Sequence, residues 1–387
     1  MNRRIFLAST LGLTLSSLAA GCQRPWSGDL GIAALAESVP GQLVQAFQRQ
    51  AQQAQAGQVS VVAKDSLIDL YRLLQTWHQQ AEKSSEEGAS DSQNTASRTA
   101  QWVTQADTWL APAIQQRLLQ PIPTDALDRW PQLPEPWPAL VRRNAQGQAD
   151  SGGDVWGIPY RWTPLAILYD QRSLGATADP IQGWDDLRRP EWNQRLMLPD
   201  DERLVIGLAL KALGTSANAS DLAAVSGLED FLAQLHRQVR WYNATHTLKA
   251  LVIGDAAATV GWLDALLPIA QRYRHLRLVI PDEGTLASAD LWVRPSVAPD
   301  PSPLAMDWLN FCLSETFTEQ MAIYGPGLTP WHWGAAAADL PPTFQPAAGL
   351  LERTTGLANS EFLLPLDPSA QAQFTDLWRR LRTGAMG

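Results

Sequence analysis

Apolar and polar residues follow two periods along this chain, and these periods predict an alternation of strands and helices. Apolar residues recur at helical spacing over residues 41–54, 67–80, 110–119, 222–238, 247–253, 262–270, 303–312, 314–324 and 370–381. Short apolar or β-branched runs predict strands at residues 59–63, 102–104, 239–242, 256–260, 276–281 and 290–293. Repeated strand–helix units predict an α/β fold with parallel sheets and helices on their faces.

Two segments interrupt this pattern. Residues 83–98 are polar and Ser-rich, which predicts a disordered surface insertion. Residues 155–160 and 166–169 predict two strands, separated by Arg161, Trp162, Thr163 and Pro164. Neither the insertion nor these four residues are predicted to continue a strand or a helix.

Residues 184–214 combine several structural signals. Residues 184–187 predict a helical turn and residues 195–198 a short strand. Asp201 is at the N-cap position of the following helix, which Gly214 ends. A strand that leads into a helix through an acidic cap points N–H groups and carboxylates at whatever lies above the sheet edge. Asp201 is therefore a candidate ligand contact, with plain helix capping as the alternative.

Length and composition narrow the class of protein. At 387 residues with 45% hydrophobic content, the chain can bury two ordinary cores, which predicts two lobes. The net charge of −9 argues against nucleic acid or an anionic membrane surface as the main partner. The 17 Trp residues are an unusual number, and Trp is frequent at sugar- and amine-binding surfaces, although structural packing explains most of them more simply.

The N-terminal residues have the pattern of an export signal. Paired arginines precede a mainly apolar run, residues 7–20, which is too short for a stable transmembrane span. Residues 3–7 (RRIFL) resemble the twin-arginine motif, and residues 18–22 (LAAGC) resemble a bacterial lipobox. We expect a signal peptide over residues 1–21 and acylation of Cys22, which would give a membrane-anchored lipoprotein in the periplasm. The alternative is an ordinary cleaved signal followed by an incidental cysteine.

Motifs for catalysis are missing from the sequence. It contains no Gly-x-Ser-x-Gly, no His-Glu-x-x-His, no Cys-x-x-Cys and no phosphate loop. The five His are scattered, and no adjacent Tyr pair is present to ligate iron. We therefore expect a protein that is not an enzyme and that has no cofactor and no metal site.

Several short blocks follow one another along the chain: residues 157–162 (GIPYRW), 184–187 (WDDL), 190–192 (PEW), 198–203 (LPDDER), 254–262 (GDAAATVGW), 281–284 (PDEG), 308–311 (WLNF) and 327–330 (GLTP). Their order and spacing resemble the polyamine-type (spermidine/putrescine) extracellular solute-binding proteins of ABC importers. The resemblance extends over residues 31–335, and the insertion at residues 83–98 departs from it.

The resemblance implies a periplasmic-binding-protein-like fold of two α/β lobes, with a hinge and an interlobe ligand cleft. Hinge closure of such lobes on a ligand is a known response. Counting the crossing segments places residues 27–160 plus 290–335 in lobe 1 and residues 161–289 plus 336–387 in lobe 2.

The family binds polyamines with carboxylates around the ammonium groups and an aromatic box around the methylene chain. Cations over Trp or Tyr rings gain about 0.5–2 kcal/mol each, and buried ammonium groups need paired carboxylates. Carried over residue by residue, the resemblance assigns ligand contacts to Asp201, Trp262 and Asp290. For each of them a purely structural role is the alternative: helix capping, core packing or an interlobe hydrogen bond.

The remaining ligand positions differ from the family. The resemblance places aromatic residues at the positions of Leu35, Ser38, Ser288 and Gly327 and a second acid at the position of Leu204, and Asp107 or Thr108 falls near another lost aromatic. Other aromatics could compensate, and the candidates are Trp162, Trp109, Trp331 and Trp333. Arg161 is a candidate for binding an anion or carboxylate, although a solvated or salt-bridged arginine is the simpler interpretation.

These observations favour a lipid-anchored solute-binding protein that delivers a small solute, polyamine-like or diverged, to an ABC transporter permease. We expect it to act as a monomer without nucleic acid. The alternative is a transport-inactive assembly or structural protein of the cell envelope on the same fold, because much of the aromatic box and one acid are missing.

Overall fold

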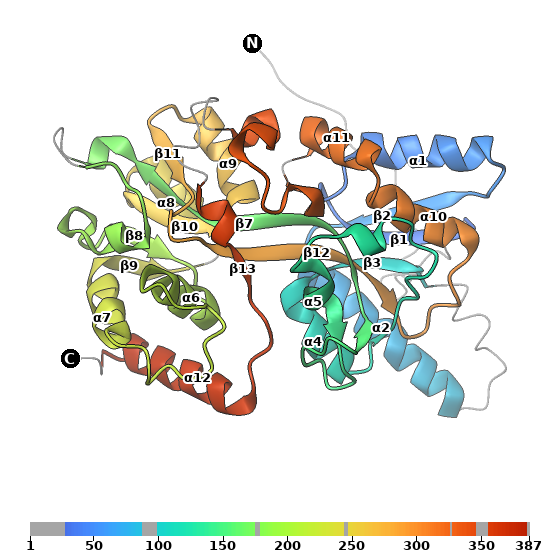
Figure 1. The fold of residues 1–387 in the computed structure, drawn as a ribbon, viewed down its shortest axis with the longest axis horizontal. Helices are drawn as coiled ribbons and strands as arrows, with labels where there is room; N and C mark the ends of the chain where they lie inside the picture. Colours follow the sequence, from blue (N-terminus) through green and yellow to red (C-terminus); the bar gives the residue numbers. More distant parts are fainter. Residues whose placement is uncertain are drawn as a thin grey trace, which may run out of the picture.

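The computed structural model describes residues 28–86, 99–174, 179–243, 247–325, 327–345 and 355–384, which form two lobes side by side (Figure 1). Two long strands, β7 (Ile158–Asp170) and β12 (Leu286–Pro295), run between the lobes and pair with each other in antiparallel fashion. The export signal, Cys22 and residues 87–98 of the insertion lie outside the described residues. The described part of the chain contains no helix that is both long and apolar enough to cross a membrane.

Strands of both lobes join β7 and β12 in one mixed sheet. Its order is β2-β1-β3-β12-β7-β10-β8-β9, with β11 also pairing with β7. The strands are β1 (Leu30–Leu35), β2 (Val59–Lys64), β3 (Trp102–Ala106), β8 (Leu196–Leu198), β9 (Val239–Tyr242), β10 (Ala258–Trp262) and β11 (Leu276–Val279). The pairs of β1 with β2 and β3, and of β8 with β9 and β10, are parallel, as strand–helix units predict. β7 and β12 run antiparallel to each other, β7 also to β10 and β11, and β12 also to β3, so the sheet as a whole is not parallel.

Helices cover the sheet in each lobe (Figure 1). The first lobe, around β1–β3, contains α1 (Gly41–Gln53), α2 (Leu67–Glu86), α4 (Leu110–Gln115), α5 (Trp137–Val141), α10 (Pro303–Cys312) and α11 (Glu315–Tyr324). The second lobe, around β8–β11, contains α6 (Glu202–Ala212), α7 (Leu228–Gln238), α8 (Thr247–Ile253), α9 (Leu263–Arg272) and α12 (Pro368–Arg382). The remaining short strands are β4 (Leu119–Gln120), β5 (Arg142–Arg143), β6 (Asp154–Val155) and β13 (Glu361–Phe362).

Four local predictions were wrong. Residues 161–164 do not separate two strands, because β7 continues through them and pairs with β12 as far as Pro164. Residues 83–86 extend α2 instead of opening the insertion. The helix expected from residue 222 begins only after Gly227, whose φ of +80° is incompatible with a continuing helix. Residues 119–120 form β4 instead of the end of a helix, and the buried strand β1 was not predicted as a strand.

Four aromatic rings pack where β7 leaves the first lobe. Trp162 on β7 lies 4.8 Å from Trp333 and 6.4 Å from Trp137 between ring centroids. Phe362 on β13 lies 4.8 Å from both Trp137 and Trp333. The indoles of Trp162 and Trp137 donate to the carbonyls of Thr329 and Pro330, at 2.9 and 3.1 Å. We call this group the hinge cluster, because it connects a crossing strand with the first lobe and the C-terminal segment.

Candidate functional site: a cavity between the lobes

A cavity of about 460 Å³ lies between the lobes, and both lobes contribute to its wall. The first lobe supplies Leu67, Ala106, Asp107, Thr108, Trp109, Ala111, Pro112, Gln115 and Gln148. The second lobe and the crossing strand β12 supply Asp201, Arg203, Leu204, Trp262, Ser288, residues 363–366 and Gln371. A small molecule bound here would contact both lobes, which is the arrangement that ligand-induced closure requires.

Two of the predicted ligand contacts lie in this cavity wall. Asp201 is the N-cap of α6, and its Oδ1 accepts from the backbone N–H of Leu204 at 3.0 Å. The capping prediction is therefore confirmed, and the side chain is exposed enough to meet a ligand as well. Trp262 is half-buried at the end of β10, where the chain turns into α9. Both residues lie where a strand ends at the cleft: Asp201 comes shortly after β8, and Trp262 is the last residue of β10.

The other two predicted contacts, Asp290 and Trp162, lie outside the residues that line the cavity. Trp162 is 1% exposed and belongs to the hinge cluster. Asp290 is buried on β12, opposite Arg161 on β7. Whether either side chain contacts a ligand stays a prediction, but in this conformation each has a structural partner.

Arg161 forms a buried ion pair with Asp290. Its Nε donates to Oδ2 of Asp290 at 2.7 Å, and its Nη2 lies 2.6 Å from the same oxygen and 3.3 Å from Oδ2 of Asp264. Burial alone lowers the pKa of Arg161, but the two carboxylates outweigh it and the net shift is upward. Arg161 is thus a salt-bridged arginine, as the simpler interpretation of the sequence had it. Burial raises the pKa of Asp290, and the guanidinium of Arg161 opposes that rise.

Because Gly327 has no side chain, the Arg161 side chain can pack against its backbone. A Cβ at position 327 would lie 2.5 Å from both Cγ and Cδ of Arg161, well inside van der Waals contact. The resemblance assigns an aromatic residue to this position, and an aromatic side chain could not coexist with Arg161 in its present place. An aromatic residue at position 327 and Arg161 in its present conformation therefore exclude each other.

Asp107 is the most unusual ionisable residue of the cavity wall. It follows β3 directly and is 4% exposed. Its Oδ1 accepts from the Ser288 hydroxyl at 2.9 Å and from the Ala289 N–H at 3.0 Å, whereas its Oδ2 is buried without a partner among the described residues. Burial raises the pKa of Asp107 to about 7, against the effect of these hydrogen bonds. The sequence indicated only that Asp107 was near a lost aromatic.

Comparison with known proteins agrees with this architecture. The sequence profile of the bacterial extracellular solute-binding proteins matches residues 103–344, which is more than half of the chain. The chain belongs to this family. The recognition made from the short sequence blocks is thereby confirmed, and so is the expectation that the chain is not an enzyme.

Relatives of this solute-binding protein include polyamine-binding proteins. The spermidine/putrescine-binding periplasmic protein of Salmonella typhimurium is 27% identical over 169 residues, which are 43% of this chain and 47% of the relative. The Escherichia coli K12 protein of the same name is 28% identical over 169 residues, with the same two coverages. The chain therefore spans about half the length of these curated relatives.

Solved structures confirm the two-lobed periplasmic-binding-protein fold. A spermidine/putrescine ABC transporter substrate-binding protein from Streptococcus pneumoniae superposes with a TM-score of 0.70 at 19% identity, over 92% of this chain and 98% of that one. A Treponema pallidum lipoprotein superposes with a TM-score of 0.63 at 16% identity, over 92% and 99% of the two chains. At these identities the likeness concerns the fold alone.

The cavity of this solute-binding protein has a different wall from the expected aromatic box. Ser288 and Thr108 line it in place of rings, and Leu204 lines it in place of an acid. Among the proposed aromatic replacements, Trp109 lines the cavity, whereas Trp331 and Trp333 do not. Within the described ranges, no group of three or more His, Cys, Asp or Glu residues is placed to hold a metal ion.

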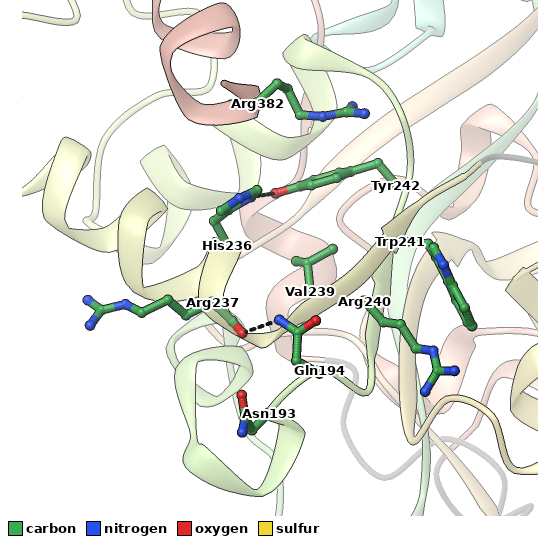
Figure 2. Close-up of a pocket in the computed structure, with 9 residues that line it drawn as sticks. All are labelled: Asn193, Gln194, His236, Arg237, Val239, Arg240, Trp241, Tyr242 and Arg382. Carbon is green, nitrogen blue, oxygen red and sulfur yellow. Dashed lines mark hydrogen bonds between the residues drawn. The ribbon is translucent and has the colours of Figure 1, made fainter. Parts of the chain in front are cut away.

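A second hollow, of about 750 Å³, lies at the outer edge of the second lobe, where β9 ends the sheet (Figure 2). It is lined by Asn193, Gln194, His236, Arg237, Val239, Arg240, Trp241, Tyr242 and Arg382. Gln194 donates to the Arg237 carbonyl at 2.9 Å, and Arg240 lies over the Trp241 ring at 4.2 Å (Figure 2). All these residues belong to one lobe and their charge is positive, so lobe closure would not enclose a solute there.

Proposed function

We propose that this protein binds a small solute, polyamine-like or a diverged ligand, and delivers it to an ABC transporter permease. The observation that carries the proposal is the interlobe cavity, because its wall combines Asp201 and Trp262 of one lobe with Asp107 and Trp109 of the other. A carboxylate and a ring from each side suit a cation with an apolar body. The names of the relatives, spermidine/putrescine-binding proteins, support the same ligand class.

Within this proposal Asp201 and Trp262 contact the solute directly. Asp290 and Trp162 act from behind the wall: Asp290 holds Arg161, and Trp162 holds β7 against the first lobe. The lobe boundaries at residues 27–160 plus 290–335 and 161–289 plus 336–387 are part of the proposal.

We also propose that the protein is exported through the signal at residues 1–21 and anchored to the membrane by acylated Cys22, as a monomer that faces the periplasm. The sequence pattern of residues 3–7 and 18–22 supports this. The Cys22→Ser variant should leave the membrane fraction and appear in the soluble fraction. A Cys312→Ser variant is the matched control, because that thiol is buried in the first lobe.

One observation favours the alternative, a transport-inactive assembly protein of the envelope. Arg161 forms an ion pair with Asp290, the acid that the resemblance assigns to ligand binding. A binding acid that is already neutralised within the protein would suit a cleft that no longer serves transport.

A thermal-shift panel of polyamines, monoamines, amino acids, sugars and anions separates the two functions. A solute that binds only the folded protein stabilises it by about 2.7 kcal/mol at a hundredfold excess over its Kd. A shift with any one class supports the solute-binding proposal. If no class raises the melting temperature, the assembly function is favoured instead.

A further inference from the structure

The acid that should receive a ligand ammonium group already has a cation. Asp290 Oδ2 accepts a hydrogen bond from Nε of Arg161 at 2.7 Å and lies 2.6 Å from its Nη2, and Arg161 is 7% exposed. A guanidinium with this geometry is a stronger partner than a second cation that must first shed its water. An incoming ammonium group would therefore have to displace Arg161, which Gly327 accommodates closely.

Another carboxylate in the cavity wall lacks such a partner. Asp107 Oδ2 has no hydrogen-bond partner within the described residues, although the atom is fully buried. Leaving a buried acceptor unsatisfied is costly, and such groups are rare in native proteins. Because Asp107 lines the cavity, a ligand donor is the partner that the fold itself does not supply.

The charged groups around Asp107 do not fill this role. Asp290 on β12 carries the same charge and raises the pKa of Asp107. Arg143 on β5 is near enough for the charge of Asp107 to raise its pKa, but its Nη1 donates to the Ala139 carbonyl. Across the cavity, Arg203 is held by the Leu364 carbonyl and by Asn218, at 3.2 and 3.1 Å. Asp201 adds a second negative charge to that wall.

The surroundings of Asp107 suit the remainder of an amine. Trp109 from the first lobe and Trp262 from the second both line the cavity, and an ammonium group near either ring gains further attraction. Much of the remaining wall is aliphatic: Leu67, Ala111, Pro112, Leu204, Leu363, Leu364, Pro365 and Leu366. The exposed Asp201 is the other carboxylate in this wall.

We propose that Asp107, in place of Asp290, receives the ammonium group of the solute, and that the cavity has one buried ammonium site instead of several. Arg161 then acts as a permanent internal substitute for a second ligand cation. This inference rests on the proposed solute-binding function and specifies its ligand as an amine that needs only one ammonium group.

The test is calorimetric titration of the purified protein with putrescine and with n-butylamine, which share a four-carbon chain but differ by one ammonium group. The two Kd values should agree within tenfold. Asp107→Asn should weaken both by about 10- to 100-fold, the range of a hydrogen bond to a charged group. Asp125→Asn, which removes an exposed acid outside the cavity, is the matched control and should change neither Kd by more than twofold.

A second readout is the number of protons released on binding. At pH 6 Asp107 is mostly protonated, so capture of a cation should release close to one proton, measured as a difference in binding enthalpy between phosphate and MES buffers. Release of a proton by the wild type, together with its loss in Asp107→Asn, supports the inference. If Asp107→Asn does not fold, proton release by the wild type still decides.

Three results would overturn the inference: amine binding without proton release, amine binding that Asp107→Asn leaves intact, or n-butylamine binding more than tenfold weaker than putrescine. Each of them leaves the solute-binding function standing. A protein that binds another solute class but no amine also overturns the inference and also leaves that function standing. Only a protein that binds no solute of any class overturns both.

Discussion

Arg161 and Asp290 face each other on the two strands that join the lobes, and a single carboxylate oxygen of Asp290 accepts from Nε of Arg161 and forms an ion pair with its Nη2. The pair is almost completely buried, so its contribution to stability is the attraction between the two charges less the cost of removing both from water. Removing charges from water is expensive, and a buried pair repays that cost only while both partners are present.

Replacing Arg161 by Met should destabilise the protein by about 3–5 kcal/mol, because Asp290 is left as an uncompensated buried acid. The double variant Arg161→Met/Asp290→Leu should recover most of this loss. Free energies of unfolding from urea titrations, followed by circular dichroism, measure both effects. Arg72→Met is the control, since Arg72 and Asp69 form an exposed ion pair whose loss should matter little. Equal losses for Arg161→Met and the double variant would contradict the argument.

Replacing Gly327 by Ala should cost about 1–3 kcal/mol, because the new Cβ overlaps the Arg161 side chain. In an Arg161→Ala background the same substitution should cost much less, and a double-mutant cycle measures this coupling. Gly41→Ala is the matched control, since nothing lies within 4 Å of its added Cβ and position 41 begins α1. Strictly additive free energies would show that Gly327 does not make room for Arg161.

Replacing Asp107 by Asn should stabilise the unliganded protein at high pH. The pKa of Asp107 is about 7 when folded and about 4 when unfolded, so between these values the native state binds the extra proton. The wild type therefore loses stability as pH rises from about 4 to 7, up to a total of about 2–4 kcal/mol, and the loss is complete above pH 7. The asparagine variant lacks this loss.

Melting temperatures of both proteins from pH 4 to 8 check this prediction. The two curves should nearly meet at pH 4 and separate in favour of Asp107→Asn above pH 6. Curves that stay parallel across the whole range would mean that Asp107 does not titrate as its burial requires.

Replacements of Asp201 can separate its two roles. Asp201→Ser keeps an N-cap acceptor and should change stability by less than about 0.5 kcal/mol, whereas Asp201→Ala should cost about 1 kcal/mol. Both remove the exposed carboxylate and should weaken binding of an amine by about two- to fivefold, the worth of a solvent-exposed ion pair. Thermal melts and calorimetry measure the two effects. If Asp201→Ser binds the amine with full affinity, Asp201 caps its helix and does not contribute to ligand binding.

The elements of the fold could largely be predicted from the sequence, because local pattern determines them. The acidic cap at Asp201 is an example, since a cap needs only its own helix. Residues 161–164 were misread because an arginine and a proline usually interrupt strands. Here β7 is buried between β12 and β10, and the charge of Arg161 is neutralised by Asp290, 129 residues further along the chain.

The site could be predicted only in part, for the same reason. The resemblance assigned Asp201 and Trp262 to the ligand, and both lie in the cavity wall, where β8 leads into α6 and β10 into α9. The unpaired Oδ2 of Asp107 became visible only once β3, β12 and the cavity were assembled, since no local pattern records a missing partner. The pairing of Gly327 with Arg161 is likewise a contact between distant segments.

The hinge cluster determines where the molecule can pivot. Trp162 is packed against rings of the first lobe, and each such contact is worth about 0.5–1.5 kcal/mol beyond the area it buries. The very next residue, Thr163, is bonded to the second lobe, where its hydroxyl accepts from the Asp264 N–H at 3.2 Å. The two lobes thus contact consecutive residues of one strand, and we expect any rotation of the lobes to be concentrated between these residues. The 3.3 Å contact of Arg161 with Asp264 spans that point and would lengthen first as the lobes separate.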